Sequence, residues 1–264
     1  MSSSLLPEIL DPIVDHLHDE PATLKACCLV SKSWVPRTRR HFFDVVDFFS
    51  PRRLELWMKT FPDPSNSPAC YTRSLRLSGF AVIPLAISDA FPWVRSFNRI
   101  TELQVWTEWE EDRNFYFAPL HGLSPILKSL HLCHYFVEPL EVINLVCSFP
   151  LLENLSLWSP EDLERENAEE WDTPPTSPRF TGSLLLDYND SQITRKLLDL
   201  PGGLHFYKVS VSCPSRDGDL ARELVSKCSD TLESLCVEFD QGKFSTVSVV
   251  DRCLIALRRC TRSP

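Results

Sequence analysis

The amino-acid sequence predicts an α/β fold in which a small helical unit precedes a repetitive parallel sheet. Three observations lead to this prediction. Apolar residues between residues 5 and 43 recur at helical spacing. A short strand-like triplet recurs at near-constant intervals from residue 70 onward. The 264 residues include 21 prolines but only 7 glycines, which is typical of many short elements joined by turns.

A three-helix unit is expected over residues 5–50, followed by a linker over residues 51–69. The nearly continuous apolar segment 23–30 indicates the second helix of this unit, and the third can begin at Ser31 or Ser33. The first helix is indicated by apolar residues three or four positions apart, which lie on one helix face: Leu10, Ile13, Val14 and Leu17.

The region 70–264 repeats an apolar-x-apolar triplet within short strand-like runs. The successive spacings between triplets are 28, 27, 25, 29, 25 and 26 residues. A period of this length with one strand per unit is similar to that of leucine-rich repeats. We therefore expect an irregular leucine-rich-repeat solenoid with a parallel sheet. The triplets are Leu75/Leu77, Leu103/Val105, Leu130/Leu132, Leu155/Leu157, Leu184/Leu186, Val209/Val211 and Leu235/Val237.

Helices are expected in three of the connections between these strands. Residues 138–147, 191–200 and 219–228 each place apolar side chains on one helix face. Prolines lie in or near many connections and predict short or irregular segments there. One connection contains an acidic and proline-rich insertion over residues 161–178, which is either a solvated segment or a docking loop.

The formal net charge is −9, and it is unevenly distributed. Residues 161–172 contain seven acidic residues and one arginine, so they carry −6 and leave −3 for the rest of the chain. This balance does not favour nucleic acid or an anionic membrane surface as a partner, so we expect neither. A local basic cluster is either a solvated helix face or a contact for an acidic partner or for the acidic insertion: Arg37, Arg39, Arg40, Arg52 and Arg53.

Nothing in the sequence is typical of a catalytic or metal site. The ten cysteines include no C-x-x-C pair, and the tight cluster His131-Leu132-Cys133-His134 has no second half at zinc-site spacing. Neighbours on a strand point to opposite faces, so Cys133 and His134 would not meet as nucleophile and base. We therefore expect a non-enzymatic protein with reduced thiols and no cofactor.

The sequence also favours a cytoplasmic or nuclear location. The longest uncharged apolar run, residues 142–152, is 11 residues long, whereas a membrane-spanning helix needs about 20. The amino terminus lacks the basic and apolar segments of a signal peptide.

The N-terminal unit resembles the F-box motif. The run Leu5-Leu6-Pro7-Glu8-Ile9-Leu10 is similar to the motif's L-P-x-E-I/L-L start, and Val30-Ser31-Lys32-Ser33-Trp34 is similar to its V-S-K-x-W end. The combination of an F-box with leucine-rich repeats is a familiar architecture. The resemblance implies a substrate-recognition subunit of a Skp–cullin–F-box ubiquitin ligase. In that family the unit binds the Skp adaptor through apolar contacts, and the repeats bind a target protein.

The resemblance assigns twelve residues to adaptor binding or to the local core of the unit, and the sequence alone does not divide the two roles. They are Leu5, Leu6, Pro7, Ile9, Leu10, Ile13, Leu17, Leu24, Cys27, Leu29, Val30 and Trp34.

The N-terminal unit departs from the family pattern at two places. Leu6 occupies the usual proline position, and Pro7 falls on a variable one. Pro12 lies where the family continues its first helix, so this helix either begins at Asp11-Pro12 or is kinked. These departures keep an alternative open, in which the chain is a repeat-based interaction scaffold without ligase association.

The exposed face of the expected sheet carries two tryptophans. Side chains alternate along a strand, so the residue after each triplet faces away from the core. Trp106, Cys133 and Trp158 hold this position on three consecutive strands, and they would form a row of about 10 Å. Tryptophan is enriched in binding hot spots. Together with His131 and the nearby Trp109, this row is therefore either a target-binding patch or a satellite core beneath loops or the acidic insertion. The predicted patch consists of Trp106, Trp109, His131, Cys133 and Trp158.

Overall fold

The computed structural model describes residues 7–78, 91–106, 117–133, 138–158, 177–187, 191–214 and 218–240. Its strands are β1 (Val45–Phe48), β2 (Ser74–Ser78), β3 (Glu102–Trp106), β4 (Ser129–Cys133), β5 (Asn154–Trp158), β6 (Ser183–Asp187), β7 (Lys208–Pro214) and β8 (Ser234–Asp240). They form one all-parallel sheet in the order β1 to β8, which confirms the predicted α/β class and the parallel sheet.

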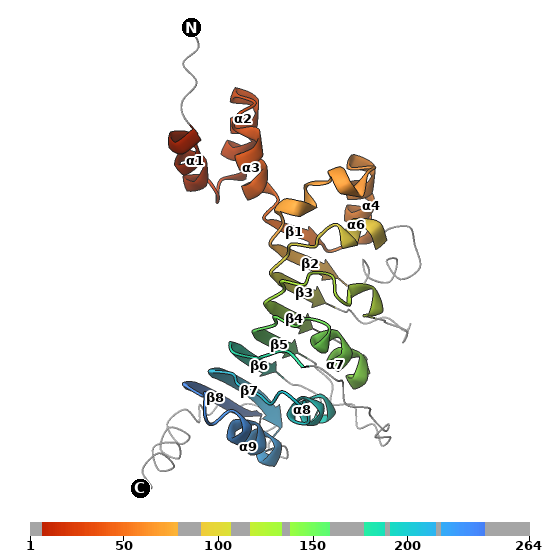
Figure 1. The fold of residues 1–264 in the computed structure, drawn as a ribbon, viewed down its shortest axis with the longest axis vertical. Helices are drawn as coiled ribbons and strands as arrows, with labels where there is room; N and C mark the ends of the chain where they lie inside the picture. Colours follow the sequence, from red (N-terminus) through yellow and green to blue (C-terminus); the bar gives the residue numbers. More distant parts are fainter. Residues whose placement is uncertain are drawn as a thin grey trace.

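The helices of the described residues fall into two groups. The first, α1 (Pro7–His16), α2 (Pro21–Val30) and α3 (Val35–Phe42), precedes the sheet at its β1 end (Figure 1). The second lies along one side of the sheet, on the right in Figure 1. A parallel pair needs a crossover connection, and these helices belong to those crossovers. They are α4 (Pro51–Thr60), α6 (Phe91–Arg95), α7 (Pro139–Cys147), α8 (Ser191–Leu198) and α9 (Gly218–Lys227).

All seven predicted triplets lie in strands, from β2 to β8. Apart from Leu235, which is partly buried, every apolar residue of the triplets is buried beneath the crossovers. Burial of one leucine side chain contributes about 1.5–3 kcal/mol, so these columns supply much of the free energy that holds the sheet together. The predicted helices over 138–147, 191–200 and 219–228 are confirmed as α7, α8 and α9.

Backbone hydrogen bonds also link neighbouring repeat units at the point where their strands begin. The carbonyl of Lys128 accepts from the N–H groups of Glu153 at 2.9 Å and Asn154 at 2.8 Å. One unit earlier, the carbonyl of Thr101 accepts in the same way from Lys128 at 2.9 Å and Ser129 at 3.0 Å. The same pair of bonds recurs at the other units except between β5 and β6, where the Glu153 carbonyl accepts from Gly182 and the Asn154 side chain accepts from the N–H of Ser183. These repeated bonds keep the strands in register along the sheet.

The sheet begins earlier in the chain than the sequence ranges suggested. Val46 and Phe48 of β1 pair with Leu75 and Leu77 of β2 and form an eighth apolar triplet inside the expected helical unit 5–50. The sequence pattern does not separate this triplet from the helical unit, because it closely follows α3 and belongs to a strand of only four residues.

The expected linker 51–69 is also structured. It contains α4, the short 3-10 turn η1 (Pro64–Asn66) and the start of a second one, η2 (Pro68–Tyr71). Trp57 of α4 packs against the rings of Phe48 and Phe97, with centroid distances of 5.7 and 5.5 Å. These buried rings close the β1 end of the core, so the segment belongs to the crossover between β1 and β2 and is not a linker.

Two further expectations concern the insertion and membranes. Most of the acidic insertion 161–178 lies outside the described residues, which resume at Ser177. In the described part of the chain, no helix has both the length and the apolar character required to cross a bilayer.

Candidate functional site

The three N-terminal helices pack around a small core of their own. Val14 of α1, Leu24 and Cys27 of α2, and Thr38 of α3 are buried. The Thr38 hydroxyl is satisfied within the helix, since it donates to the carbonyl of Trp34 at 2.8 Å. The structure therefore assigns Leu24 and Cys27, among the residues expected to bind an adaptor, to the local core.

Four other residues of the expected adaptor site stay exposed although they are apolar. Leu29 and Val30 at the end of α2 are 88% and 68% exposed, and Ile9 and Ile13 on α1 are 50% and 45% exposed. Ile9 and Ile13 are four residues apart and lie on one helix face. Exposed aliphatic side chains on two helices of such a small unit indicate a protein-binding surface.

The remaining residues of that set are less informative. Leu17 and Trp34 are half-buried. Leu5 and Leu6, together with the side chains of Pro7 and Leu10, lie outside the described residues. Pro12 lies inside α1, which runs from Pro7 to His16, so the helix does not begin at Asp11-Pro12. Since proline has no N–H, α1 lacks one internal hydrogen bond at this position.

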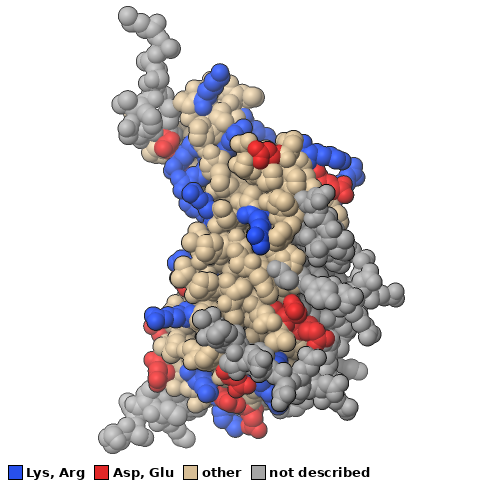
Figure 2. All heavy atoms as spheres, turned by 45° about the vertical axis from the view of Figure 1, so that its right-hand side comes forward, with Lys and Arg blue, Asp and Glu red and all other residues tan. Residues whose placement is uncertain are grey.

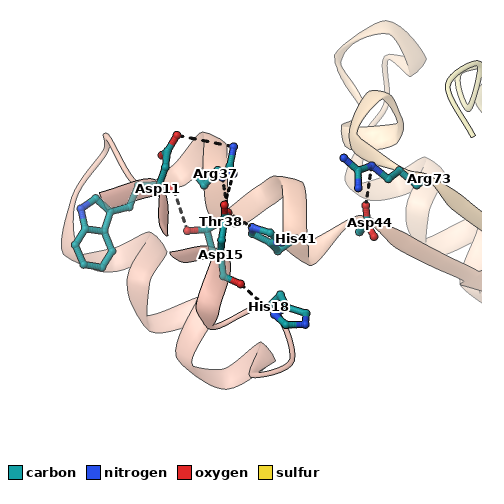
Figure 3. A network of polar contacts seen from close by, with 9 residues as sticks. Asp11, Asp15, His18, Arg37, Thr38, His41, Asp44 and Arg73 are labelled. Carbon is teal, nitrogen blue, oxygen red and sulfur yellow. Dashed lines mark hydrogen bonds and ion pairs between the residues drawn. The ribbon is translucent and has the colours of Figure 1, made fainter. Parts of the chain in front are cut away.

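A polar cluster that the sequence did not reveal fixes α1 against α3 (Figure 3). The Asp15 carboxylate accepts a hydrogen bond from Arg37 Nε at 2.6 Å, receives a second Arg37 nitrogen, and lies 2.6 Å from His41 Nε2. The hydrogen bonds from the Arg37 guanidinium hold the pKa of Asp15 well below its ordinary value of 3.8. Asp15 is therefore ionised at neutral pH and ties the two helices together.

The exposed face of the sheet contains the predicted aromatic row. Trp106 pairs in register with Cys133, and Cys133 pairs with Trp158, so the three residues occupy neighbouring strands at the same level. All three are half-buried. The structure thus brings together three of the five predicted target-binding residues, and Trp109 lies outside the described residues.

Phe49 extends this row toward the start of the sheet. Its ring centroid lies 5.8 Å from that of Trp106. The Arg53 guanidinium lies over the Phe49 ring, 5.8 Å from its centroid. The small side chain of Ser78 occupies the intervening strand and leaves room for this contact. Phe49 directly follows the overlooked triplet of β1, so the same periodic signal could have found it.

His131 belongs to a polar patch beside the aromatic row. Its Nε2 lies 3.8 Å from Glu102 Oε1, and Gln104 donates a hydrogen bond to the same carboxylate oxygen. Burial lowers the pKa of His131, whereas the negative charge of Glu102 acts in the opposite direction. A neutral imidazole beside a carboxylate and an amide offers hydrogen bonds to a ligand without adding positive charge.

The chemistry of the row favours binding. Burial raises the pKa of Cys133 to about 11, so its thiol is protonated at neutral pH and is a poor nucleophile. Over the described ranges, no three His, Cys, Asp or Glu side chains are grouped so as to hold a metal ion. The row can therefore supply aromatic and hydrogen-bonding contacts to a protein surface.

No protein-family model matches this sequence, and no curated protein matches it either.

Proposed function

We propose that this protein is the substrate-recognition subunit of a Skp–cullin–F-box type ubiquitin ligase. In this proposal α1, α2 and α3 form an F-box that binds a Skp-type adaptor, and the strands with their one-sided crossovers form a leucine-rich-repeat solenoid that binds a target protein. Such a subunit would act in the cytoplasm or nucleus.

The main support for this proposal comes from the exposed apolar residues of the helical unit. Ile9, Ile13, Leu29 and Val30 occupy motif positions, and they are exposed while other motif residues fill the core. A helical unit of this size buries little apolar surface by itself. An adaptor that covers these side chains would remove them from water and would gain about 25 cal/mol for each Å² of apolar surface buried.

The mechanism we propose is tethering, without covalent chemistry by this chain. The target binds the sheet face around Trp106 and Trp158, while the adaptor holds the N-terminal helices in the ligase. A target lysine then stays close to the ubiquitin-carrying enzyme at an effective concentration that can reach the millimolar range.

The alternative is an interaction scaffold that has no ligase partner. The reason to consider it is Pro12, which departs from the family pattern and removes one internal hydrogen bond of α1. Because the helix continues on both sides of this proline, the face that bears Ile9 and Ile13 is retained, which supports adaptor binding.

A pull-down with a purified Skp adaptor separates the two functions. Wild-type protein should retain the adaptor, and an Ile13→Asp/Leu29→Asp variant should lose it, because carboxylates would replace two exposed apolar contacts. The matched control is Leu56→Asp on α4, where an equally apolar side chain is 64% exposed outside the unit. Failure of the wild-type protein to retain the adaptor would refute the ligase function and favour the alternative function as an interaction scaffold.

A further inference from the structure

A hollow of about 470 Å³ lies where α3 meets the residues that lead into β2, β3 and β4. It is separate from both surfaces described above. Arg40 enters its wall from α3, Arg73 lies directly before β2, and Arg99 and Thr101 precede β3. Its remaining wall includes Thr72 and Ile126.

The charge of this hollow is positive and poorly compensated. Arg73 has a long contact with Asp44, 3.6 Å from Nε to Oδ1, which Figure 3 shows. Arg40 and Arg99 form no ion pair among the described residues. Figure 2 shows Lys and Arg side chains gathered along one side of the junction between the helical unit and the sheet. In a chain with a net charge of −9, this concentration of positive charge is a local exception.

Two basic residues near the hollow are neutralised by carboxylates. Arg37, three residues before Arg40 on α3, is held by Asp15. Lys128, directly before β4, is paired with Glu153 at 2.8 Å. Three guanidinium groups around one hollow repel each other, and a bound anion would remove this repulsion while forming charge-assisted hydrogen bonds.

The shape of the hollow favours an extended peptide over a single small anion. It crosses the starts of three consecutive strands, which are about 4.8 Å apart, so it extends about 10 Å along the sheet. In an extended peptide, every second side chain lies on the same face, at intervals of about 7 Å. The exposed Ile126 in the wall also offers an apolar contact, which a small inorganic anion would not use.

The wall contains one further group that a peptide can use. Thr72 is 1% exposed, and its hydroxyl has no hydrogen-bond partner. An unsatisfied buried hydroxyl is costly, and a peptide carbonyl or carboxylate oxygen is a suitable acceptor after rotation of this side chain.

We propose that this hollow binds an acidic stretch of a partner polypeptide in an extended conformation. Arg40, Arg73 and Arg99 receive its Asp or Glu carboxylates, and Ile126 contacts an adjacent apolar side chain. The site does not depend on the adaptor, so it can be tested on the isolated full-length chain.

Fluorescence anisotropy with a labelled peptide of alternating Glu and Ala tests the proposal. The wild-type chain should bind this peptide, and an equivalent peptide of Gln and Ala should bind at least about tenfold more weakly. Raising sodium chloride from about 50 to about 300 mM should weaken the binding of the acidic peptide, because salt screens exposed charges.

Paired charge-reversal variants locate the binding site. Arg40→Glu/Arg99→Glu should weaken binding by about tenfold or more, whereas Arg195→Glu/Lys227→Glu on α8 and α9 makes the same change in net charge elsewhere and should change binding less than about threefold. Circular dichroism and thermal unfolding verify folding. If the charge-reversal variant does not fold, Arg40→Gln/Arg99→Gln replaces it with the same expectation.

Three outcomes overturn the proposal. Equal losses in the two double variants would show non-specific attraction by net charge. Equal binding of the Glu and Gln peptides would show that carboxylates are not recognised. Absence of detectable binding of the Glu peptide would refute the proposal, and binding of a labelled phosphoserine–alanine peptide in its place would identify a phosphate site.

Discussion

The ring of Phe49 lies 5.8 Å from the indole of Trp106, across a strand that contributes only the small side chain of Ser78 at this level. Phe49 directly follows the last residue of β1, and Trp106 is the last residue of β3. The contact extends the aromatic row that runs through Cys133 to Trp158 over the first five strands of the sheet. The exposed face therefore has an aromatic side at the strand ends and a polar side around Glu102 and His131.

We expect the aromatic row to be required for capture of the target. A Trp106→Ala/Trp158→Ala variant should lose the proteins that co-purify with the wild-type chain, because two large aromatic contacts are removed. Mass spectrometry of the co-purified proteins measures this. Tyr207→Ala, which truncates an exposed aromatic side chain away from the row, should leave the same set bound. An unchanged set in the tryptophan variant would disprove this role.

The thiol of Cys133 should resist alkylation. With a pKa of about 11, only about one molecule in a thousand carries the thiolate at pH 8. Timed treatment with iodoacetamide, followed by peptide mass spectrometry, should modify the exposed Cys70 long before Cys133. Rapid modification of Cys133 in the folded protein would mean that its side chain is less buried than the structure shows.

The Asp15–Arg37 pair should stabilise the N-terminal helices in a pH-dependent way. Asp15 has a lowered pKa in the folded state, so its contribution is fully present above its unfolded-state pKa and is lost as the pH falls through the folded-state pKa. Asp15→Asn should therefore lower the free energy of unfolding by about 1 kcal/mol at pH 7, since the pair is partly exposed.

Urea unfolding at several pH values tests this prediction. The difference in free energy of unfolding between Asp15→Asn and the wild-type protein should shrink below about pH 4. In this range Asp15 becomes protonated in the unfolded chain, so its ionised form stabilises the folded state less. A difference that stays constant down to about pH 2 would show that packing, and not the charge of Asp15, sets its contribution.

Substitution of Gly182 should destabilise the sheet between β5 and β6. A Cβ at this position would lie 2.8 Å from the carbonyl oxygen of Glu153 and against the Asn154 side chain, whose Oδ1 accepts from the backbone N–H of Ser183 at 2.8 Å. Gly182→Ala should therefore lower the free energy of unfolding by about 2–3 kcal/mol, measured by urea titration.

Gly122→Ala serves as the comparison for Gly182. A Cβ at Gly122 would have no atom within 4 Å, but its φ of +64° is unfavourable for alanine. We expect a loss of about 1 kcal/mol from this strain alone. If Gly182→Ala is as mild as Gly122→Ala, the backbone around Glu153 moves more freely than its hydrogen bonds imply.

The repeating part of the fold could be predicted because its signal is periodic and local. Each apolar triplet marks one strand, and the spacing between triplets places the strands beside each other in order. The first strand is harder to predict, because Val46 and Phe48 closely follow the helical unit. They lie 29 residues before Leu75 and Leu77 and continue the same period.

The candidate sites were only partly accessible to sequence reasoning. The column of Trp106, Cys133 and Trp158 follows from side-chain alternation, and the register confirms it. The pair between Asp15 and Arg37, 22 residues apart, depends on how two helices pack. Similarly, the F-box-like motif does not predict that Leu24 is buried while Leu29 is exposed. Both are apolar motif positions on α2, and the sequence alone does not tell which side of this helix faces the core.

The strict order of the sheet has a consequence for how the chain folds. Among the described strands, each one pairs only with its neighbours in sequence, so its pairing does not depend on a distant part of the chain. Once β1, α4 and β2 have closed the first end of the core, each later unit can be added to a finished edge. Folding can therefore proceed from the amino-terminal end during synthesis, before the last strands have left the ribosome.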